Sequence, residues 1–168
     1  MCGPFSARRS SFLLLKNKVG LPVRLCAPEE TIWSKAFIQE RERFDGADVA
    51  HIIRAASPDL DWDRLLRRFG LHWRVLLSHL VLFGFIYPSE RDKIPARVLR
   101  ELTGRLLTET EAPPPSDNVC QGTLLSRAQY LTDIERQGFE DGRVEPRGPM
   151  TVDDVALWTE AIGGEERR

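Results

Sequence analysis

The chain has 168 residues, of which 42% are apolar and 29% are charged, and its net charge is −1 at pH 7. This length suffices for one domain with a core, and the composition is that of a soluble globular protein rather than a disordered one. The near-zero charge gives no general reason to expect nucleic acid or an acidic membrane as a partner. The three cysteines are widely spaced and lack a CxxC pair, which excludes a disulfide framework and favours a reducing cytoplasm.

The amino-terminal part predicts an atypical or disordered start followed by a short pair of strands. Residues 1–19 are basic, and their apolar run at residues 12–15 is shorter than the core of a secretory signal, so we expect no leader and a cytoplasmic location. Residues 12–15 and 23–26 are extended candidates, and Gly20 and Pro22 between them predict a turn. Two strands do not make a stable sheet, so we expect the core to come from helices.

Two helices are predicted next, and they meet at a corner formed by Asp45 and Gly46. Pro28 begins the first helix, which we expect to continue to about Arg43. The second helix ends at Ser57 and Pro58, because the residue before a proline disfavours helical geometry. The apolar face of the first helix consists of Ile32, Trp33, Ala36 and Phe37, with Glu40 and Phe44 further along the same side. The face of the second consists of Val49, Ile52, Ile53 and Ala56.

Three further helices complete a bundle that we expect to extend over residues 20–110. Asp61 is a good N-cap for the third helix, and Gly70 is a good stop at its end. The fourth helix, residues 72–85, is apolar on nearly all sides, so we expect other helices to surround it. It is too short to cross a bilayer, and no membrane partner is expected. Pro95 begins the fifth helix.

The last third of the chain predicts a linker and a smaller helical part. Residues 111–122 are rich in proline and form the linker, and residues 123–168 form a C-terminal helical extension. One helix is expected near residues 124–137, closed by Gly138. A last helix presents the apolar residues Val155, Trp158 and Ile162. The fold class expected from all these elements is mainly α, a helical bundle with a short N-terminal strand pair.

Charged residues that could build a site concentrate at the corner between the first two helices. Lys35 borders the apolar face of its helix, and Asp45 and Asp48 follow at the corner. A lysine that faces two carboxylates can serve phosphate chemistry, because the ammonium neutralises phosphate charge while the carboxylates hold a metal or orient a base. A network of ion pairs and helix caps is the alternative interpretation of the same residues.

The sequence around this corner also carries a family resemblance. Residues 23–35 read VRLCAPEETIWSK, and residues 41–53 read RERFDGADVAHII. Together they resemble a motif of bacterial nucleotidyltransferases related to AbiEii-type toxins, in which a short strand leads into a helix bearing a lysine and an Asp-x-x-Asp corner opens the next helix. The resemblance covers residues 20 to about 162 and corresponds to the carboxyl-terminal part of such proteins.

The resemblance implies transfer of a nucleotide from a nucleoside triphosphate to an acceptor, with magnesium as the cofactor. By this similarity Lys35 and Arg43 would bind the nucleotide, and Asp45 and Asp48 would be the catalytic residues. The Gly-Ser and Asp-x-Asp motifs that hold the metal ions in this family do not occur before Lys35. We therefore expect a truncated member that is inactive alone, or one that needs a partner protein. The alternative is a non-catalytic helical interaction module or an inert fragment.

Other patterns in the sequence predict no further site. The third and fourth helices have helix-turn-helix-like spacing, but the fourth offers few polar side chains at its start, so we expect no nucleic-acid partner. The histidines do not share one helical face, so no metal pair is predicted at His51, His72 and His79. All the tryptophans take inward helical positions, which predicts that the core contains Trp33, Trp62, Trp73 and Trp158.

Overall fold

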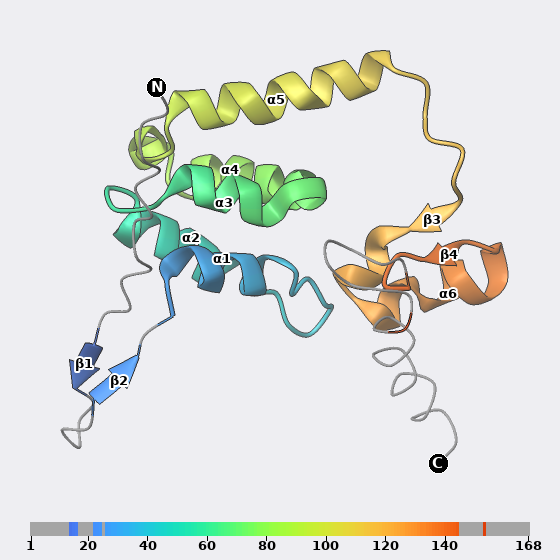
Figure 1. Cartoon of the computed structure of the whole chain (residues 1–168), viewed down its shortest axis with the longest axis horizontal. Helices are drawn as coiled ribbons and strands as arrows, with labels where there is room; N and C mark the ends of the chain where they lie inside the picture. The colour runs from blue at the N-terminus through green and yellow to red at the C-terminus, as the bar shows by residue number, and fades with distance from the viewer. Residues whose placement is uncertain (1–13, 17–21, 25, 145–152, 154–168) are drawn as a thin grey trace, which may run out of the picture. The chain divides into compact units, whose positions relative to one another are not determined.

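The structure is a computed structural model that describes residues 14–16, 22–24, 26–144 and 153. The predicted mainly α fold with a short strand pair is confirmed (Figure 1). Most of residues 1–19 lie outside the described residues. The expected last helix, with Val155, Trp158 and Ile162, also lies outside them.

The chain divides into two compact units, and the chain passes between them more than once. Unit 1 consists of Met1–Ala36 and Gly46–Gly104. Unit 2 consists of Phe37–Asp45 and Arg105–Arg168. The corner that separates the first two helices therefore belongs to a different unit from the helices themselves.

The predicted pair of strands is present near the start of the chain. Strand β1 (Leu14–Lys16) runs antiparallel to strand β2 (Pro22–Arg24), and Leu15 lies opposite Val23 (Figure 1). This pair leads directly into the first helix, because α1 begins at Pro28.

The core of unit 1 consists of four helices and the first part of a fifth, which continues beyond Gly104. Their bounds are α1 Pro28–Ala36, α2 Gly46–Ala56, α3 Trp62–Phe69, α4 Trp73–Ile86 and α5 Ala96–Glu111. Two short 3-10 helices connect them, η1 Gly70–His72 and η2 Pro88–Lys93. Helix α1 contacts α2, α3 and α4, and α4 also contacts α2 and α3. Apolar side chains from each helix are fully enclosed, among them Ile32, Ile53, Leu65, Phe83 and Leu102. Burial of these side chains stabilises unit 1.

Helix α3 forms as the sequence predicts, because both of its ends carry their own signals. The Asp61 carboxylate accepts a hydrogen bond of 2.9 Å from the backbone N–H of Arg64, which satisfies one open donor of the first turn. Gly70 ends the helix with a positive φ of 48°, a conformation that costs glycine little. The side that faces the core consists of Trp62, Leu65, Leu66 and Phe69, all buried.

The prediction that the first helix continues to Arg43 is wrong, because α1 ends at Ala36. Residues beyond Ala36 find hydrogen-bond partners outside the helix. The backbone N–H of Gln39 donates to the carbonyl of Leu125, and Glu40 and Arg43 exchange backbone hydrogen bonds across a tight turn. Phe44, expected on the buried side, is 53% exposed. Long-range hydrogen bonds thus outweigh the local helical preference of this segment.

Helix α4 is not enclosed on all sides, contrary to the prediction from its composition. One side is buried, with Leu76, Leu80 and Phe83 enclosed. The opposite side exposes four large apolar side chains, which we call the α4 face: Val81, Leu82, Phe85 and Ile86. Val81 and Phe85 are one turn apart, as are Leu82 and Ile86, and these two adjacent pairs place all four residues on one stripe of the helix.

By length and composition, Trp62–Ile86 is the one stretch of the described residues that could cross a membrane. Gly70 interrupts it, so the stretch consists of α3, η1 and α4. Core helices of soluble proteins pass the same test. The buried apolar side chains of this stretch belong to the core of unit 1.

The tryptophans of the described helices differ in how deeply they are buried. Trp62 and Trp73 are buried, as predicted. Trp33 is only half-buried, and the guanidinium carbon of Arg68 lies 4.3 Å from the centre of its ring. Trp158 lies outside the described residues. The core prediction therefore holds for Trp62 and Trp73, whereas Trp33 is only partly buried.

Unit 2 contains a small, tightly turned structure beyond the proline-rich segment, with β3 Val119–Cys120, η3 Gln121–Leu124, α6 Arg127–Gln137 and β4 Glu140–Asp141. The two strands pair in parallel. Gly138 ends α6 with φ 75°, as the sequence predicts. A Cβ at Gly122 would lie within 3 Å of the Tyr130 ring, so the close approach of η3 and α6 requires glycine there.

Candidate functional site

Lys35 and Asp48 meet as the sequence predicts, across the contact between α1 and α2. The Lys35 Nζ donates a hydrogen bond of 2.7 Å to Asp48 Oδ2. The Lys35 side chain is 29% exposed and the Asp48 side chain 53% exposed, so the pair lies at the surface of unit 1. Ion pairs this exposed contribute little to stability. The pair therefore adds little to the packing of the two helices.

Arg43 and Asp45 form a second pair, which belongs to unit 2. The Nε and Nη2 atoms of Arg43 each donate to one oxygen of the Asp45 carboxylate, both at 3.2 Å. This fork geometry is the usual one between arginine and a carboxylate. Of the four residues predicted to form one site, Lys35 pairs with Asp48 in unit 1, and Arg43 pairs with Asp45 in unit 2.

The described residues do not fit a magnesium site at this corner. Magnesium prefers carboxylate oxygens that converge on one point. Each of the two aspartates instead binds a cationic side chain, Lys35 for Asp48 and Arg43 for Asp45. Among the described residues, no three side chains of His, Cys, Asp or Glu gather closely enough to hold a metal ion. No step that depends on a metal is derived from these residues.

Two acidic residues at the start of α1 bind α3 rather than a ligand. Glu30 accepts hydrogen bonds from Arg64 Nη2 at 2.8 Å and from Arg68 Nε at 2.9 Å. The hydrogen bond with Glu30 is the main cause that raises the pKa of Arg64 above its ordinary value. Glu29 is buried and accepts from the backbone N–H of Asp61 at 2.8 Å.

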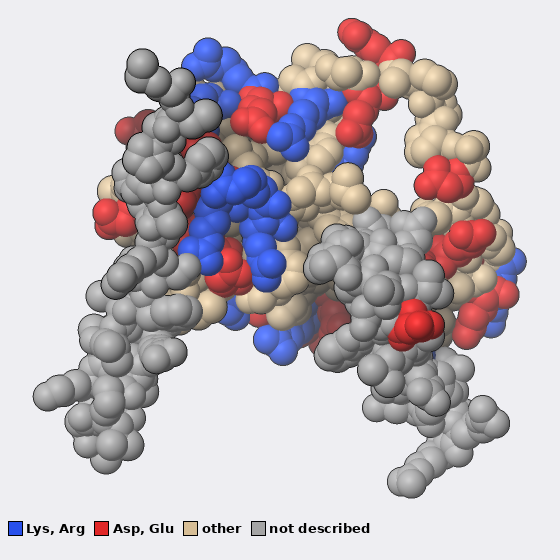
Figure 2. Space-filling model, in the orientation of Figure 1, with Lys and Arg blue, Asp and Glu red and all other residues tan. Residues whose placement is uncertain are grey.

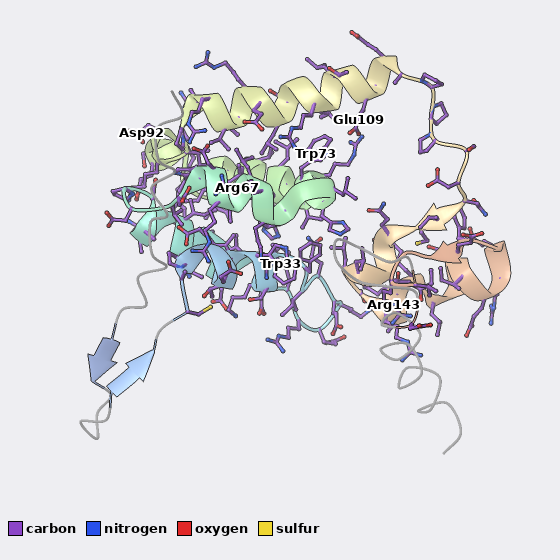
Figure 3. All side chains as sticks on the ribbon, viewed as in Figure 1. Trp33, Arg67, Trp73, Asp92, Glu109 and Arg143 are labelled. Atoms are coloured by element: carbon purple, nitrogen blue, oxygen red, sulfur yellow. The ribbon has the colours of Figure 1, made fainter. Side chains whose placement is uncertain are left out.

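Two of the arginines of α3 thus bind an acidic residue of α1. Figure 2 shows Lys and Arg side chains beside acidic ones on this face. Figure 3 labels Arg67 on α3 and Trp33 on α1. Arg64 and Arg68 are engaged with Glu30. Arg64 and Arg68 thus share a single carboxylate, so the charge on this side of unit 1 is only partly neutralised by these contacts.

His79 is a buried polar residue at the point where the chain leaves unit 1. Its Nε2 lies 2.9 Å from the carbonyl oxygen of Ala36, the last residue of α1, so Nε2–H donates this hydrogen bond. Burial lowers the pKa of His79, and the hydrogen bond to Ala36 offsets this in part. The neutral ring is therefore favoured, and it holds the end of α1 against α4.

The structure also reveals a hollow that the sequence did not indicate. It has a volume of about 440 Å³ and is lined by His51, Arg54, Ala55 and Lys93. The first three come from α2, and Lys93 comes from η2. Because Lys93 lies 39 residues after Arg54 in the chain, no local pattern brings the two together. The sequence signals only the contact between Glu90 and Lys93, which are three residues apart on η2.

A further charged cluster stabilises unit 2. Arg143 binds both oxygens of the Asp141 carboxylate, and Thr123 Oγ1 donates to Asp141 Oδ1 at 2.6 Å. Burial raises the pKa of Asp141, but these hydrogen bonds outweigh burial and lower it to about 2. The cluster connects η3 with the segment after β4, and each polar group in it is satisfied within unit 2. Its arrangement indicates a structural role.

Comparison with known proteins finds no match. No family model, no curated protein and no solved structure matches the chain.

Proposed function

We propose that this chain is a nucleotidyltransferase-type protein, which binds a nucleoside triphosphate for transfer of the nucleotide to an acceptor. The observation that supports the proposal is the surface pair of Lys35 and Asp48, where α1 and α2 meet as the family motif implies. An ammonium group oriented by a neighbouring carboxylate is suited to contact a phosphate, because its position is set before the ligand arrives. Lys35 is therefore the proposed phosphate contact.

The roles of the other three residues follow from where each is placed. Asp48 orients Lys35 through the bond of 2.7 Å. Arg43 and Asp45 bind each other in unit 2, and their implied roles, in nucleotide binding and in catalysis, are part of the proposal. Magnesium stays part of the proposal only as the usual companion of a triphosphate, and no reaction step is assigned to it.

Replacing Lys35 by alanine is expected to weaken binding of a nucleoside triphosphate by about tenfold, since a hydrogen bond to a charged group contributes about 1.5–3 kcal/mol. The measurement is isothermal titration with ATP and magnesium at constant ionic strength. Lys35→Arg should retain most of the affinity, because it keeps the charge. Transfer from labelled nucleoside triphosphates to candidate acceptors is assayed with the same variants.

A matched control is Arg67→Ala, which removes one positive charge from the exposed side of α3. It should leave the affinity nearly unchanged. No saturable binding of ATP to the wild-type chain at millimolar concentration would refute the proposal. Equal losses in Lys35→Ala and Arg67→Ala would also refute it, because they would show a general effect of charge.

A second candidate function is a non-catalytic helical interaction module, and the exposed α4 face supports it. Phe85 is 82% exposed, and no charged side chain interrupts the face. We propose a second copy of this chain as its partner, with the two α4 helices antiparallel. Each α4 face then packs against the same apolar face of the other copy, as a two-fold symmetric dimer requires.

Replacing Phe85 by serine tests this pairing by sedimentation equilibrium. The wild-type chain should associate to a dimer, and Phe85→Ser should weaken the association by about tenfold or more, because Phe85 is the most exposed residue of the α4 face. Ser89→Ala, beyond the end of α4, is the control. A wild-type chain that remains monomeric at all concentrations would rule out the dimer.

A further inference from the structure

The hollow beside α2 has the composition of an anion site. Three of the four residues that line it, His51, Arg54 and Lys93, carry nitrogen donors, and the fourth, Ala55, is small. Its volume is about 440 Å³, and it is an open depression of the surface rather than an enclosed pocket. The hollow lies entirely within unit 1.

Two of the cations in the hollow are held in place by one carboxylate. Glu90 Oε1 accepts a hydrogen bond of 2.8 Å from Arg54 Nε, and Glu90 Oε2 accepts one of 2.8 Å from Lys93 Nζ. These two bonds, that of Lys93 first, lower the pKa of Glu90 below its ordinary value, so the carboxylate stays ionised. The bonds fix the separation of the guanidinium and the ammonium before any ligand binds.

Further contacts orient both cations. Lys93 Nζ also donates to the backbone carbonyl of Arg54 at 2.8 Å, which anchors η2 to the end of α2. The guanidinium carbon of Arg54 lies 5.0 Å from the centre of the Tyr87 ring, and this stacking sets the plane of the guanidinium. A planar guanidinium whose Nε is engaged still has its terminal nitrogens for a bidentate ligand.

The charges of these side chains leave the hollow positive. Arg54 and Lys93 contribute one positive charge each and Glu90 contributes one negative charge, which leaves one positive charge before His51 is counted. The Glu90 carboxylate bridges the two cations, and Glu90 is not among the residues that line the hollow. An anion in the hollow would contact nitrogen donors, and the Glu90 carboxylate lies beside two of them.

We propose that this hollow binds the phosphate group of a small phosphate monoester, with Arg54, Lys93 and His51 as its donors. A tetrahedral phosphate carries a charge of about −1.5 to −2 at neutral pH and accepts hydrogen bonds from several directions, which matches three donors on two elements. The volume exceeds that of a phosphate alone, so the organic part of the ester has room beside Ala55. The site uses neither Lys35 nor Asp48 and is independent of the proposed nucleotide contact.

Replacing Ala55 by glutamate tests the proposal without disturbing the contacts of Glu90. Ala55 is exposed on α2, and glutamate and glutamine are both good helix formers, so the fold should tolerate either side chain. Titration with phenyl phosphate at constant ionic strength should show saturable binding to the wild-type chain, weakened by about tenfold or more in Ala55→Glu. Ala55→Gln adds the same bulk without the charge, so Ala55→Glu should bind phenyl phosphate about tenfold more weakly than Ala55→Gln.

Two control variants and a second ligand distinguish binding in the hollow from a general effect of positive charge. Arg91→Gln removes a positive charge from η2 at a residue that does not line the hollow, and it should leave the affinity unchanged. Lys35→Ala should also leave it unchanged, so failure of the nucleotide proposal does not affect this result. Inorganic phosphate serves as the second ligand, and tighter binding of phenyl phosphate supports a monoester.

Three outcomes would overturn the assignment. One is the absence of saturable binding of either ligand at about 10 mM. Another is equal binding by Ala55→Glu and Ala55→Gln, which would place the anion elsewhere. Binding of inorganic phosphate as tight as that of phenyl phosphate would replace the monoester with free phosphate as the ligand.

Discussion

Replacing Phe83 by alanine is expected to lower the free energy of unfolding of unit 1 by about 3–5 kcal/mol, the range for aromatic residues removed from a packed core. Phe83 is fully buried on the inner side of α4, and its ring centre lies 5.4 Å from that of Tyr87. A loss of this size is a large part of the stability of an ordinary domain. Urea unfolding followed by tryptophan fluorescence measures it, because Trp62 and Trp73 are buried in the same unit.

Phe85→Ala is the matched control, since it removes the same side chain two residues further along the same helix. Phe85 is 82% exposed in a single copy, so at protein concentrations low enough for the chain to be monomeric the expected change in unfolding free energy is below about 0.5 kcal/mol. Comparable losses in both variants would mean that the α4 face is covered in solution, which would agree with the proposed dimer. Loss in neither variant would contradict the packing of α4 described above.

Replacing Asp141 by asparagine is expected to lower the free energy of unfolding of unit 2 by about 2 kcal/mol at neutral pH. The pKa of this carboxyl is about 2 in the folded chain, against an ordinary value of 3.8. Because the folded value is the lower one, the stabilisation is fully present above pH 3.8 and is lost as the pH falls through about 2. The difference between wild type and variant should therefore narrow over this acidic range.

Unfolding of unit 2 can be followed through the NMR signals of α6 in urea at several values of pH. Asp117→Asn is the control, because Asp117 is exposed in the proline-rich segment and its replacement should change little at any pH. If the difference between wild type and Asp141→Asn stayed constant from pH 5 to about pH 2, the contact with Arg143 would not be the source of the stabilisation.

Local signals predicted those parts of the fold whose causes are local. Helix α3 has its cap at Asp61 and its stop at Gly70, and both act within one turn of the helix. Gly138 ends α6 in the same way. The end of α1 could not be predicted, because the hydrogen bond that draws Gln39 away from the helix comes from Leu125, far along the chain. Composition also could not show which side of α4 remains exposed.

The candidate site shows the same limit. Lys35 and Asp48 come together because adjacent packed helices carry them, an arrangement that helical spacing could predict. Because the first helix ends at Ala36, helical spacing could not predict the position of Asp45, whose carboxylate binds Arg43 within unit 2. The phosphate hollow was missed because Lys93 reaches α2 from η2, and only the folded chain shows that Glu90 holds it against Arg54.

The segment Phe37–Asp45 also has a consequence for the order in which the protein is made. It is synthesised between α1 and α2, yet its partner Leu125 leaves the ribosome only after all of unit 1 has been translated. The helices of unit 1 can therefore pack while this segment still lacks its partner. The turn between Glu40 and Arg43 closes through backbone hydrogen bonds of its own, which shields these polar groups during the delay. Unit 2 is thus completed last, from two pieces of chain that are made far apart in time.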